Sequence, residues 1–242
     1  LDTGSEDDTV AIAKRYTDKV FDFEWCDDFA AARNAALAHA RGDWCLTLDA
    51  DEVLQFPESA REKLIEFMMK HTPLTLGTLE IESVFGEENQ VALDHTRRFF
   101  HRESYQYCGA IHEQLEAREG PRAEALTGLR VIHSGYAQSY DDPAHKALRN
   151  IPLLQHAIES DPLNEYYWYQ LGIAQYSIKN YAHAIEALAE AERRIDFTHP
   201  IPTGSQGPLA RAVLTNLATS LAYAYVNMNQ MEQACSVLER HL

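Results

Sequence analysis

The sequence has few basic residues and only four cysteines, and it lacks the long apolar runs of membrane proteins. Its 242 residues include 21 Lys and Arg against 37 Asp and Glu, and the net charge of −16 argues against non-specific binding to nucleic acid or anionic membranes. No apolar run approaches the ~18 residues of a membrane helix, and no signal peptide opens the chain. Without a Cys-x-x-Cys pair, a zinc knuckle or a disulfide framework is not expected. We therefore expect a globular cytoplasmic protein with no nucleic-acid partner and no transmembrane segment.

Short apolar runs alternate with helical stretches before residue 140, and this alternation predicts an α/β fold. The expected helices are Phe29 to Ala40 and Pro57 to Lys70, and the expected strands are Trp44 to Leu48, Thr75 to Val84, Arg97 to Phe100 and Leu129 to His133. The run at Trp44 is apolar throughout, which is typical of a buried parallel strand. We therefore expect a Rossmann-like, mostly parallel sheet in residues 1–140.

The strand pattern ends near residue 140, and a helical repeat follows in residues 141–242. Three apolar positions recur 50 residues apart, in the pairs Leu171 and Leu221, Ala184 and Ala234, and Leu188 and Leu238. Their offsets resemble a tetratricopeptide repeat of ~34 residues, with an insertion supplied by the Pro- and Gly-containing stretch from Phe197 to Pro208. Two generic helical hairpins are the alternative interpretation. Such repeats must stack on each other, on the first domain or on a second subunit, because one repeat cannot bury its apolar face alone.

The acidic motif Leu48-Asp49-Ala50-Asp51-Glu52 directly follows a predicted strand. Ligands of parallel α/β sheets bind beyond the carboxyl ends of the strands. Three carboxylates there are suitable ligands for Mg²⁺ or Mn²⁺, and such ions commonly bind substrate phosphates as well. The alternative is a strand end whose aspartates cap the next helix.

Two enzyme families carry an Asp-x-Asp motif at such a place. The stretch from Asp49 to Val53 resembles the signature of haloacid-dehalogenase phosphatases, in which the first Asp is the nucleophile. That family also requires a downstream Gly-Asp and a positioned Lys. No Gly-Asp follows residue 43, and Lys63 and Lys70 fall on the helix immediately after the motif. The phosphatase is therefore the less favoured alternative.

More of the chain resembles family 2 glycosyltransferases of the GT-A fold, in the bacterial branch with C-terminal tetratricopeptide repeats. The resemblance depends on the order and spacing of several short motifs and covers essentially the whole chain. They are Asp2-Thr3-Gly4-Ser5, Phe29-Ala30-x-x-Arg33-Asn34, Gly42-Asp43-Trp44, Leu48-Asp49-Ala50-Asp51-Glu52, Arg98-Phe99-Phe100, Ile111-His112-Glu113 and Ile132-His133-x-Gly135-Tyr136. It implies a GT-A-like domain at 1–140 and tetratricopeptide-like repeats at 141–242. In the family, a strand, a helix and most of a second strand precede the Asp-Thr-Gly-Ser turn, so we expect the sequence to be N-terminally truncated.

The resemblance also assigns residues to the nucleotide-sugar donor. Asp2 is expected to bind the base or ribose, and the turn Thr3-Gly4-Ser5 allows the backbone to approach the nucleotide. Arg33 and Asn34 are expected to face the same crevice, where Arg33 binds a phosphate. For Arg33 alone, a surface salt bridge is an equal alternative.

The metal and the catalytic base follow from the same resemblance. Asp51 is expected to bind Mn²⁺ or Mg²⁺ bridging the diphosphate, and Asp49 to bind the ribose or the metal. His133 is expected to be a further metal ligand, with a structural histidine as the alternative. Glu113 is expected to be the base that activates the acceptor, with a surface glutamate as the alternative.

The sequence therefore predicts an inverting, metal-dependent glycosyltransferase that uses a nucleotide-sugar donor, with a UDP-sugar as the expected one. The acceptor is expected to be a peptide, a glycan or a lipid-linked saccharide, and the branch that the sequence resembles includes peptide S-glycosyltransferases. The repeats are expected to bind the acceptor or to pair two subunits as a homodimer. The non-enzymatic alternative is a tetratricopeptide scaffold with an inactive transferase remnant. Of Arg97 and Arg98, strand alternation sends one into the cleft, but the sequence does not say which.

Overall fold

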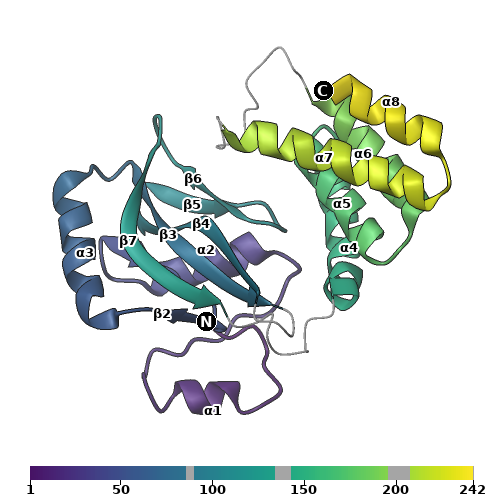
Figure 1. Cartoon of the computed structure of the whole chain (residues 1–242). Helices are drawn as coiled ribbons and strands as arrows, with labels where there is room; N and C mark the ends of the chain where they lie inside the picture. The colour runs from purple at the N-terminus through teal and green to yellow at the C-terminus, as the bar shows by residue number, and fades with distance from the viewer. Residues whose placement is uncertain (86–89, 134–142, 196–207, 242) are drawn as a thin grey trace. The chain divides into compact units, whose positions relative to one another are not determined.

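The computed structural model describes residues 1–85, 90–133, 143–195 and 208–241, and the chain divides into two compact units, Leu1–Asp141 and Asp142–Leu242. Figure 1 shows an α/β unit followed by a unit of helices, which confirms the predicted fold class. The predicted border at residues 140 and 141, the motif residues Gly135 and Tyr136, and nearly all of the predicted insertion after Phe197 lie outside the described residues.

The first unit contains three helices and seven strands in its described part. Helix α2 begins after Asp28, whose side chain accepts a hydrogen bond from the Ala31 N–H at 2.8 Å. Helix α3 begins on Pro57, as the sequence predicts. The elements are α1 (Thr9–Ala13), α2 (Phe29–His39), β1 (Trp44–Leu46), β2 (Glu52–Leu54), α3 (Pro57–Lys70), β3 (Thr75–Phe85), β4 (Gln90–His101), β5 (Tyr105–Cys108), β6 (Gln114–Ala117) and β7 (Ala123–His133).

The main sheet has five strands in the order β1-β4-β3-β7-β2 and is mostly antiparallel. Only β3 and β7 run parallel, whereas β1 with β4, β3 with β4 and β2 with β7 are antiparallel. The prediction of a mostly parallel sheet is therefore wrong for the described strands. One reason is that β3 and β4 are separated only by residues 86–89, and so short a connection joins antiparallel neighbours. Strands β5 and β6 form a separate two-stranded sheet.

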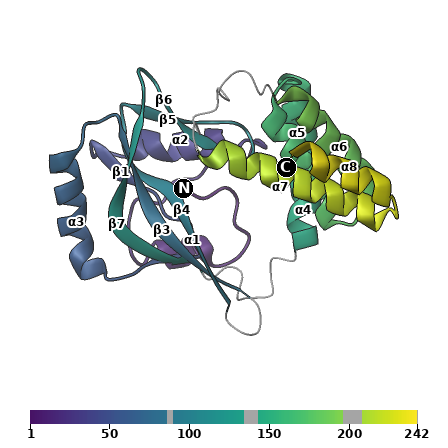
Figure 2. The same ribbon diagram turned by 45° about the horizontal axis from the view of Figure 1, so that its top comes forward.

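Each face of the main sheet packs on its own apolar core, because successive side chains of a strand point to opposite faces. Figures 1 and 2 show α3 and α2 on different sides of this sheet. The core on the α3 side consists of Ala60, Phe67, Leu79, Ile81, Phe99, Leu129 and Val131. The core on the side of α2 and the β5–β6 sheet consists of Ala30, Cys45, Leu76, Phe100, Tyr105, Tyr107 and Leu115. The neighbours Phe99 and Phe100 thus serve opposite cores, which anchors this end of β4.

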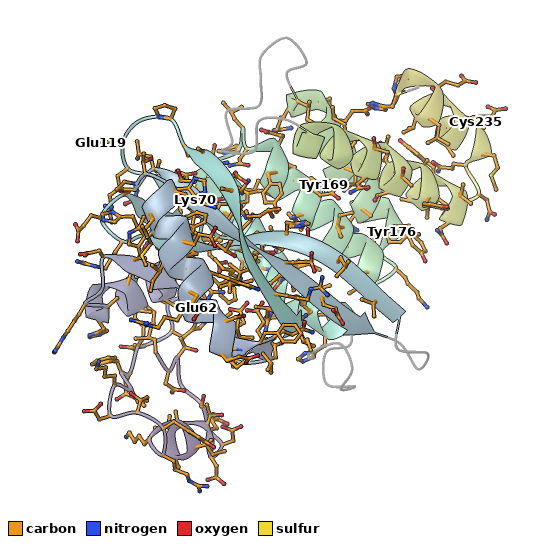
Figure 3. All side chains as sticks on the ribbon, turned by 60° about the vertical axis from the view of Figure 1, so that its left-hand side comes forward. Glu62, Lys70, Glu119, Tyr169, Tyr176 and Cys235 are labelled. Atoms are coloured by element: carbon orange, nitrogen blue, oxygen red, sulfur yellow. The ribbon has the colours of Figure 1, made fainter. Side chains whose placement is uncertain are left out.

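The described elements of the second unit are all helices. They are α4 (Pro143–Ser160), α5 (Glu165–Ser177), α6 (Tyr181–Arg194), α7 (Pro208–Asn227) and α8 (Met231–His241). Figure 3 labels Tyr169 and Tyr176 on α5 and Cys235 on α8. Most of the predicted repeat positions are buried in this unit, including Ala184, Leu188, Leu221 and Ala234, but Leu238 is 42% exposed. Trp168 and Tyr169 pack against the core of this unit.

Gly172 of α5 lies where α5 and α6 approach closely. A Cβ atom at Gly172 would lie 2.5 Å from Leu188 Cγ and 3.2 Å from the Leu188 backbone N. A Gly-to-Ala exchange in a helix usually stabilises by about 1 kcal/mol, but overpacking of a filled core costs about 1–3 kcal/mol. We therefore expect Gly172→Ala to lower the melting temperature in thermal unfolding followed by circular dichroism. A raised melting temperature would show that the two helices are not in contact here.

Within the described residues, no helix combines the length and the apolar character needed to cross a membrane.

Candidate active site

A chain of ion pairs joins three predicted motifs that are far apart in the sequence. Arg33 on α2 donates from Nη2 to Asp49 Oδ1 at 2.7 Å and from Nε to Glu113 Oε1 at 3.0 Å. Arg98 on β4 donates from Nη2 to Asp49 Oδ2 and to Glu52 Oε1, each at 2.7 Å. The order is therefore Glu113–Arg33–Asp49–Arg98–Glu52, with carboxylates and guanidiniums alternating. The predicted base and the acidic motif thus share one arginine, Arg33.

The ion pairs of this series are partly buried, so solvent screens their charges less than on an open surface. The side chain of Glu52 is 3% exposed and that of Arg98 is 13% exposed. Burial raises the pKa of Asp49, but hydrogen bonds and charge from Arg98 and Arg33 outweigh it and hold this pKa below its usual value. Burial likewise opposes the charge of Arg33, and Asp49 and Glu113 outweigh it, so the pKa of Arg33 is raised. Arg33 and Asp49 therefore stay ionised together.

The acidic motif forms a closed turn between β1 and β2. The Asp49 N–H donates to Glu52 Oε2 at 2.8 Å, and the Glu52 N–H donates to the Asp49 carbonyl at 3.1 Å. Glu52 is the first residue of β2 and pairs with His133 of β7. Asp51 lies inside this turn, and its Oδ2 is 2.9 Å from His133 Nε2. The structure therefore brings together two of the three predicted metal ligands.

Asp49, the third predicted ligand, faces the two arginines with both of its oxygens. Within the described ranges, no group of three or more His, Cys, Asp or Glu side chains is arranged to hold a metal ion. A carboxylate and an imidazole nevertheless suit Mn²⁺. Ions of this kind are often held by one or two protein ligands together with substrate phosphates and water. The pair of Asp51 and His133 therefore fits an ion that binds jointly with a diphosphate.

Asn34 is predicted to lie in the nucleotide-sugar site. Both polar atoms of its side chain form hydrogen bonds to the backbone of one residue, Tyr107. Its Nδ2 donates to the Tyr107 carbonyl at 2.8 Å, and its Oδ1 accepts from the Tyr107 N–H at 3.0 Å. These bonds fix α2 on β5. The Tyr107 ring lies 5.7 Å from the Arg33 guanidinium carbon, and its hydroxyl is 3.2 Å from Thr47 Oγ1. Tyr107 is thus a site neighbour that the sequence analysis missed.

The predicted nucleotide turn is closed by Asp2. The carboxylate of Asp2 accepts from the Gly4 and Ser5 N–H groups at 3.0 Å and from Ser5 Oγ at 2.6 Å. Gly4 adopts a φ of 109°, which favours glycine. The backbone of Asp2 bonds to Phe21 and Phe23, so the turn follows a strand-like bridge. The hydrogen bonds of the Asp2 side chain lie within the turn.

The sequence does not decide which of the neighbours Arg97 and Arg98 enters the site. Arg98 reaches the acidic motif, whereas Arg97 donates from Nε to Glu124 at 2.8 Å and from Nη1 to Gln114 at 3.4 Å. The signal for an arginine in the cleft was present in Arg97-Arg98-Phe99-Phe100. The register of β4, which decides between the two, is a property of the folded sheet.

Residues 1–117 match the family described as Glycosyl transferase family 2. The SPbeta prophage-derived glycosyltransferase SunS of Bacillus subtilis (strain 168) is 26% identical over 196 residues, which are 79% of this chain and 46% of that protein. A TPR repeat-containing protein of Synechococcus elongatus is 59% identical over 54 residues, which are 22% of this chain and 13% of that protein. The chain thus spans less than half the length of these curated relatives. A solved structure of MamA AMB-1 covers 40% of this chain and 48% of its own, at 20% identity and a TM-score of 0.31.

The matched range contains the Asp2 turn, Arg33, the acidic motif and Glu113, and it ends before His133. The helical unit, Asp142–Leu242, follows the matched range along the chain. Residues 1–117, just under half of the chain, thus match glycosyl transferase family 2, and 54 residues of the chain are similar to a TPR repeat-containing protein.

Proposed function

We propose that the protein is an inverting, metal-dependent glycosyltransferase that moves a sugar from a nucleotide-sugar donor to an acceptor. The observation that carries this proposal is the double contact of Arg33 with Asp49 and Glu113. It supports one site for donor and acceptor chemistry, because a residue of the acidic motif and the proposed base bind the same guanidinium.

Asp51 and His133 are the proposed ligands of Mn²⁺ or Mg²⁺, and the predicted role of Asp49 as a third ligand stays a prediction. When bound, such an ion stabilises the negative charge of a departing diphosphate. The guanidinium of Arg33 carries five N–H donors, and among the described contacts Nη1 makes no bond. Arg33 can therefore donate to a diphosphate oxygen without releasing either carboxylate.

Glu113 is the proposed base. Among the described contacts, its Oε1 accepts from Arg33 and its Oε2 accepts no hydrogen bond. Oε2 is proposed to take the proton of the acceptor nucleophile as that nucleophile attacks the anomeric carbon. The bond from this carbon to the diphosphate oxygen breaks, and its electron pair leaves with the diphosphate. A single attack from the opposite face inverts the configuration of the anomeric carbon.

The proposed donor is a UDP-sugar, and Asp2 with the turn Thr3-Gly4-Ser5 is proposed to bind its nucleoside. The proposed acceptor is a peptide, a glycan or a lipid-linked saccharide. The tetratricopeptide-like region is proposed to bind this acceptor or to pair two copies of the chain.

Calorimetric titration of UDP, with and without Mn²⁺, tests the donor site. We expect Mn²⁺ to strengthen UDP binding in the wild-type protein, and we expect Asp51→Ala to remove this metal dependence. The physical reason is that Asp51 supplies one of the two proposed protein ligands of the ion, next to His133. Asp94→Ala is the matched control, because Asp94 is an exposed aspartate whose side chain bonds to the adjacent His95 N–H.

The titration has clear opposing outcomes. UDP binding that ignores both Mn²⁺ and Asp51→Ala would contradict the proposed metal site. Absence of UDP binding in the wild-type protein at millimolar concentration would favour the scaffold with an inactive transferase remnant.

A further inference from the structure

Arg98 lies at an irregularity of the main sheet. Gly77 of β3 pairs with Phe99 of β4, but the next residue, Thr78, pairs with Arg97. Arg98 is therefore the extra residue of β4, as in a β-bulge. Bulges are common next to active sites because they re-aim a side chain. At Gly77 a Cβ atom would lie 2.9 Å from Phe99 Cβ, which shows how closely the strands approach here.

The re-aimed side chain of Arg98 holds both ends of the acidic turn. Its Nη2 donates to Asp49 at the start of the turn and to Glu52 at the end, each at 2.7 Å. Its carbonyl accepts from the Thr47 N–H at 2.9 Å, just before the turn. Glu52 is almost fully buried, and its second oxygen bonds back to the Asp49 N–H. Arg98 thus holds the turn through three contacts, with Asp49, Glu52 and Thr47.

Asp51 is carried by this turn. The turn closes at Glu52, which pairs with His133 in the register of β2 and β7. The separation of Asp51 from His133, 2.9 Å between Oδ2 and Nε2, therefore depends on how the turn is closed. Without the positive charge of the Arg98 guanidinium, the carboxylates of Asp49 and Glu52 would repel each other, and the turn would open.

We propose that Arg98 is a positioning residue that closes the Asp49–Glu52 turn and so places Asp51 against His133 for the metal. This inference rests on the proposed function, because it assigns Arg98 to the preparation of the proposed metal site. Among the described residues, the side-chain contacts of Arg98 are with Asp49 and Glu52, and its proposed role involves no bond to the ion or the donor. Its role is to keep the ligands in place before the ion and the diphosphate arrive.

The chain offers a matched control in the adjacent residue. Arg97 is on the same strand, its side chain is 17% exposed against 13% for Arg98, and it also forms an ion pair, with Glu124. Loss of a residue that supports metal ligands typically lowers metal affinity about 10–100-fold. Arg98→Gln and Arg97→Gln therefore remove equivalent charges from one strand, but only Arg98→Gln should change the metal site.

The test is a Mn²⁺ titration in the presence of saturating UDP, followed by electron paramagnetic resonance of free Mn²⁺, with thermal unfolding of each variant in parallel. We expect Arg98→Gln to raise the Mn²⁺ dissociation constant at least about 10-fold and Arg97→Gln to leave it within about twofold of wild type. Glu52→Gln leaves one acceptor oxygen for the two bonds that Glu52 accepts, from Arg98 and from the Asp49 N–H, and should act like Arg98→Gln. If Arg98→Gln does not fold, Glu52→Gln decides the result.

Folded Arg98→Gln or Glu52→Gln protein with wild-type Mn²⁺ affinity would overturn the positioning role. An equal loss in Arg97→Gln would overturn it as well, because the effect would then belong to the strand and not to the turn. If the wild-type protein itself does not bind Mn²⁺ with UDP, the proposed metal-dependent function fails, and that outcome is distinct from a failure of Arg98 alone.

Discussion

Glu113→Gln is expected to lower kcat for sugar transfer by about 10²–10⁴-fold while the affinity for the donor changes little. Gln keeps the size of Glu and can still accept from Arg33 through its amide oxygen, but it cannot take a proton from the acceptor. Among the described residues, Arg33 contacts only Oε1 of Glu113. The amide nitrogen of Gln can therefore take the place of Oε2, the oxygen proposed to face the acceptor. The measurement is the initial rate of transfer at saturating donor, together with UDP affinity by calorimetry.

Glu116→Gln is the matched control for this experiment, because Glu116 is an exposed glutamate on the neighbouring strand β6. It should transfer sugar at the wild-type rate. A Glu113→Gln protein that retains more than about a tenth of the wild-type kcat would contradict the assignment of Glu113 as the base.

Arg33→Met is expected to have the second largest effect, because it removes the guanidinium that joins the proposed base to the acidic motif. Glu113 and Asp49 then lose their shared partner, and the side chain of Glu113, 14% exposed, is left without this counter-charge. Breaking a buried pair on one side typically costs about 3–5 kcal/mol, and the 28% exposure of Arg33 reduces this to about 2 kcal/mol. We also expect kcat/KM to fall by about 10²-fold, because charge stabilisation and orientation are both lost.

Urea unfolding and steady-state kinetics of the folded protein separate the two effects of Arg33→Met. Arg41→Met is the control, because Arg41 is exposed and lies just beyond the end of α2. If Arg33→Met only lowered stability and its folded fraction transferred sugar normally, Arg33 would be a structural residue and not part of the active site.

Helices α2 and α3 could be predicted from the sequence because their signals are local. Pro57 begins α3 and Asp28 caps α2, and the first turn of a helix depends on such neighbours. The position of the acidic motif after a short apolar strand was also local. The direction of the strands was not, because an apolar run such as that at Trp44 looks the same in a parallel and in an antiparallel pair. The mostly parallel sheet was therefore predicted wrongly.

The predicted site residues depended on order and spacing along the chain, and the structure joins Arg33, Asp49 and Glu113 in one chain of ion pairs. Sequence patterns did not predict Arg98, because strand alternation assumes a regular ladder and β4 carries an extra residue there. Nor did they predict that Asn34 bonds to the backbone of Tyr107. That pairing depends on how α2 packs on β5, which is a long-range contact.

The most direct test of the central claim is the release of nucleoside diphosphate from a panel of UDP-, GDP- and dTDP-sugars, with Mn²⁺ and with a chelator. If the protein is a metal-dependent glycosyltransferase, we expect UDP release that requires Mn²⁺ and is lost in both Asp51→Ala and Glu113→Gln. The anomeric configuration of the product, followed by nuclear magnetic resonance, should be inverted relative to the donor. No diphosphate from any donor, or release that survives the chelator and Asp51→Ala, would contradict it.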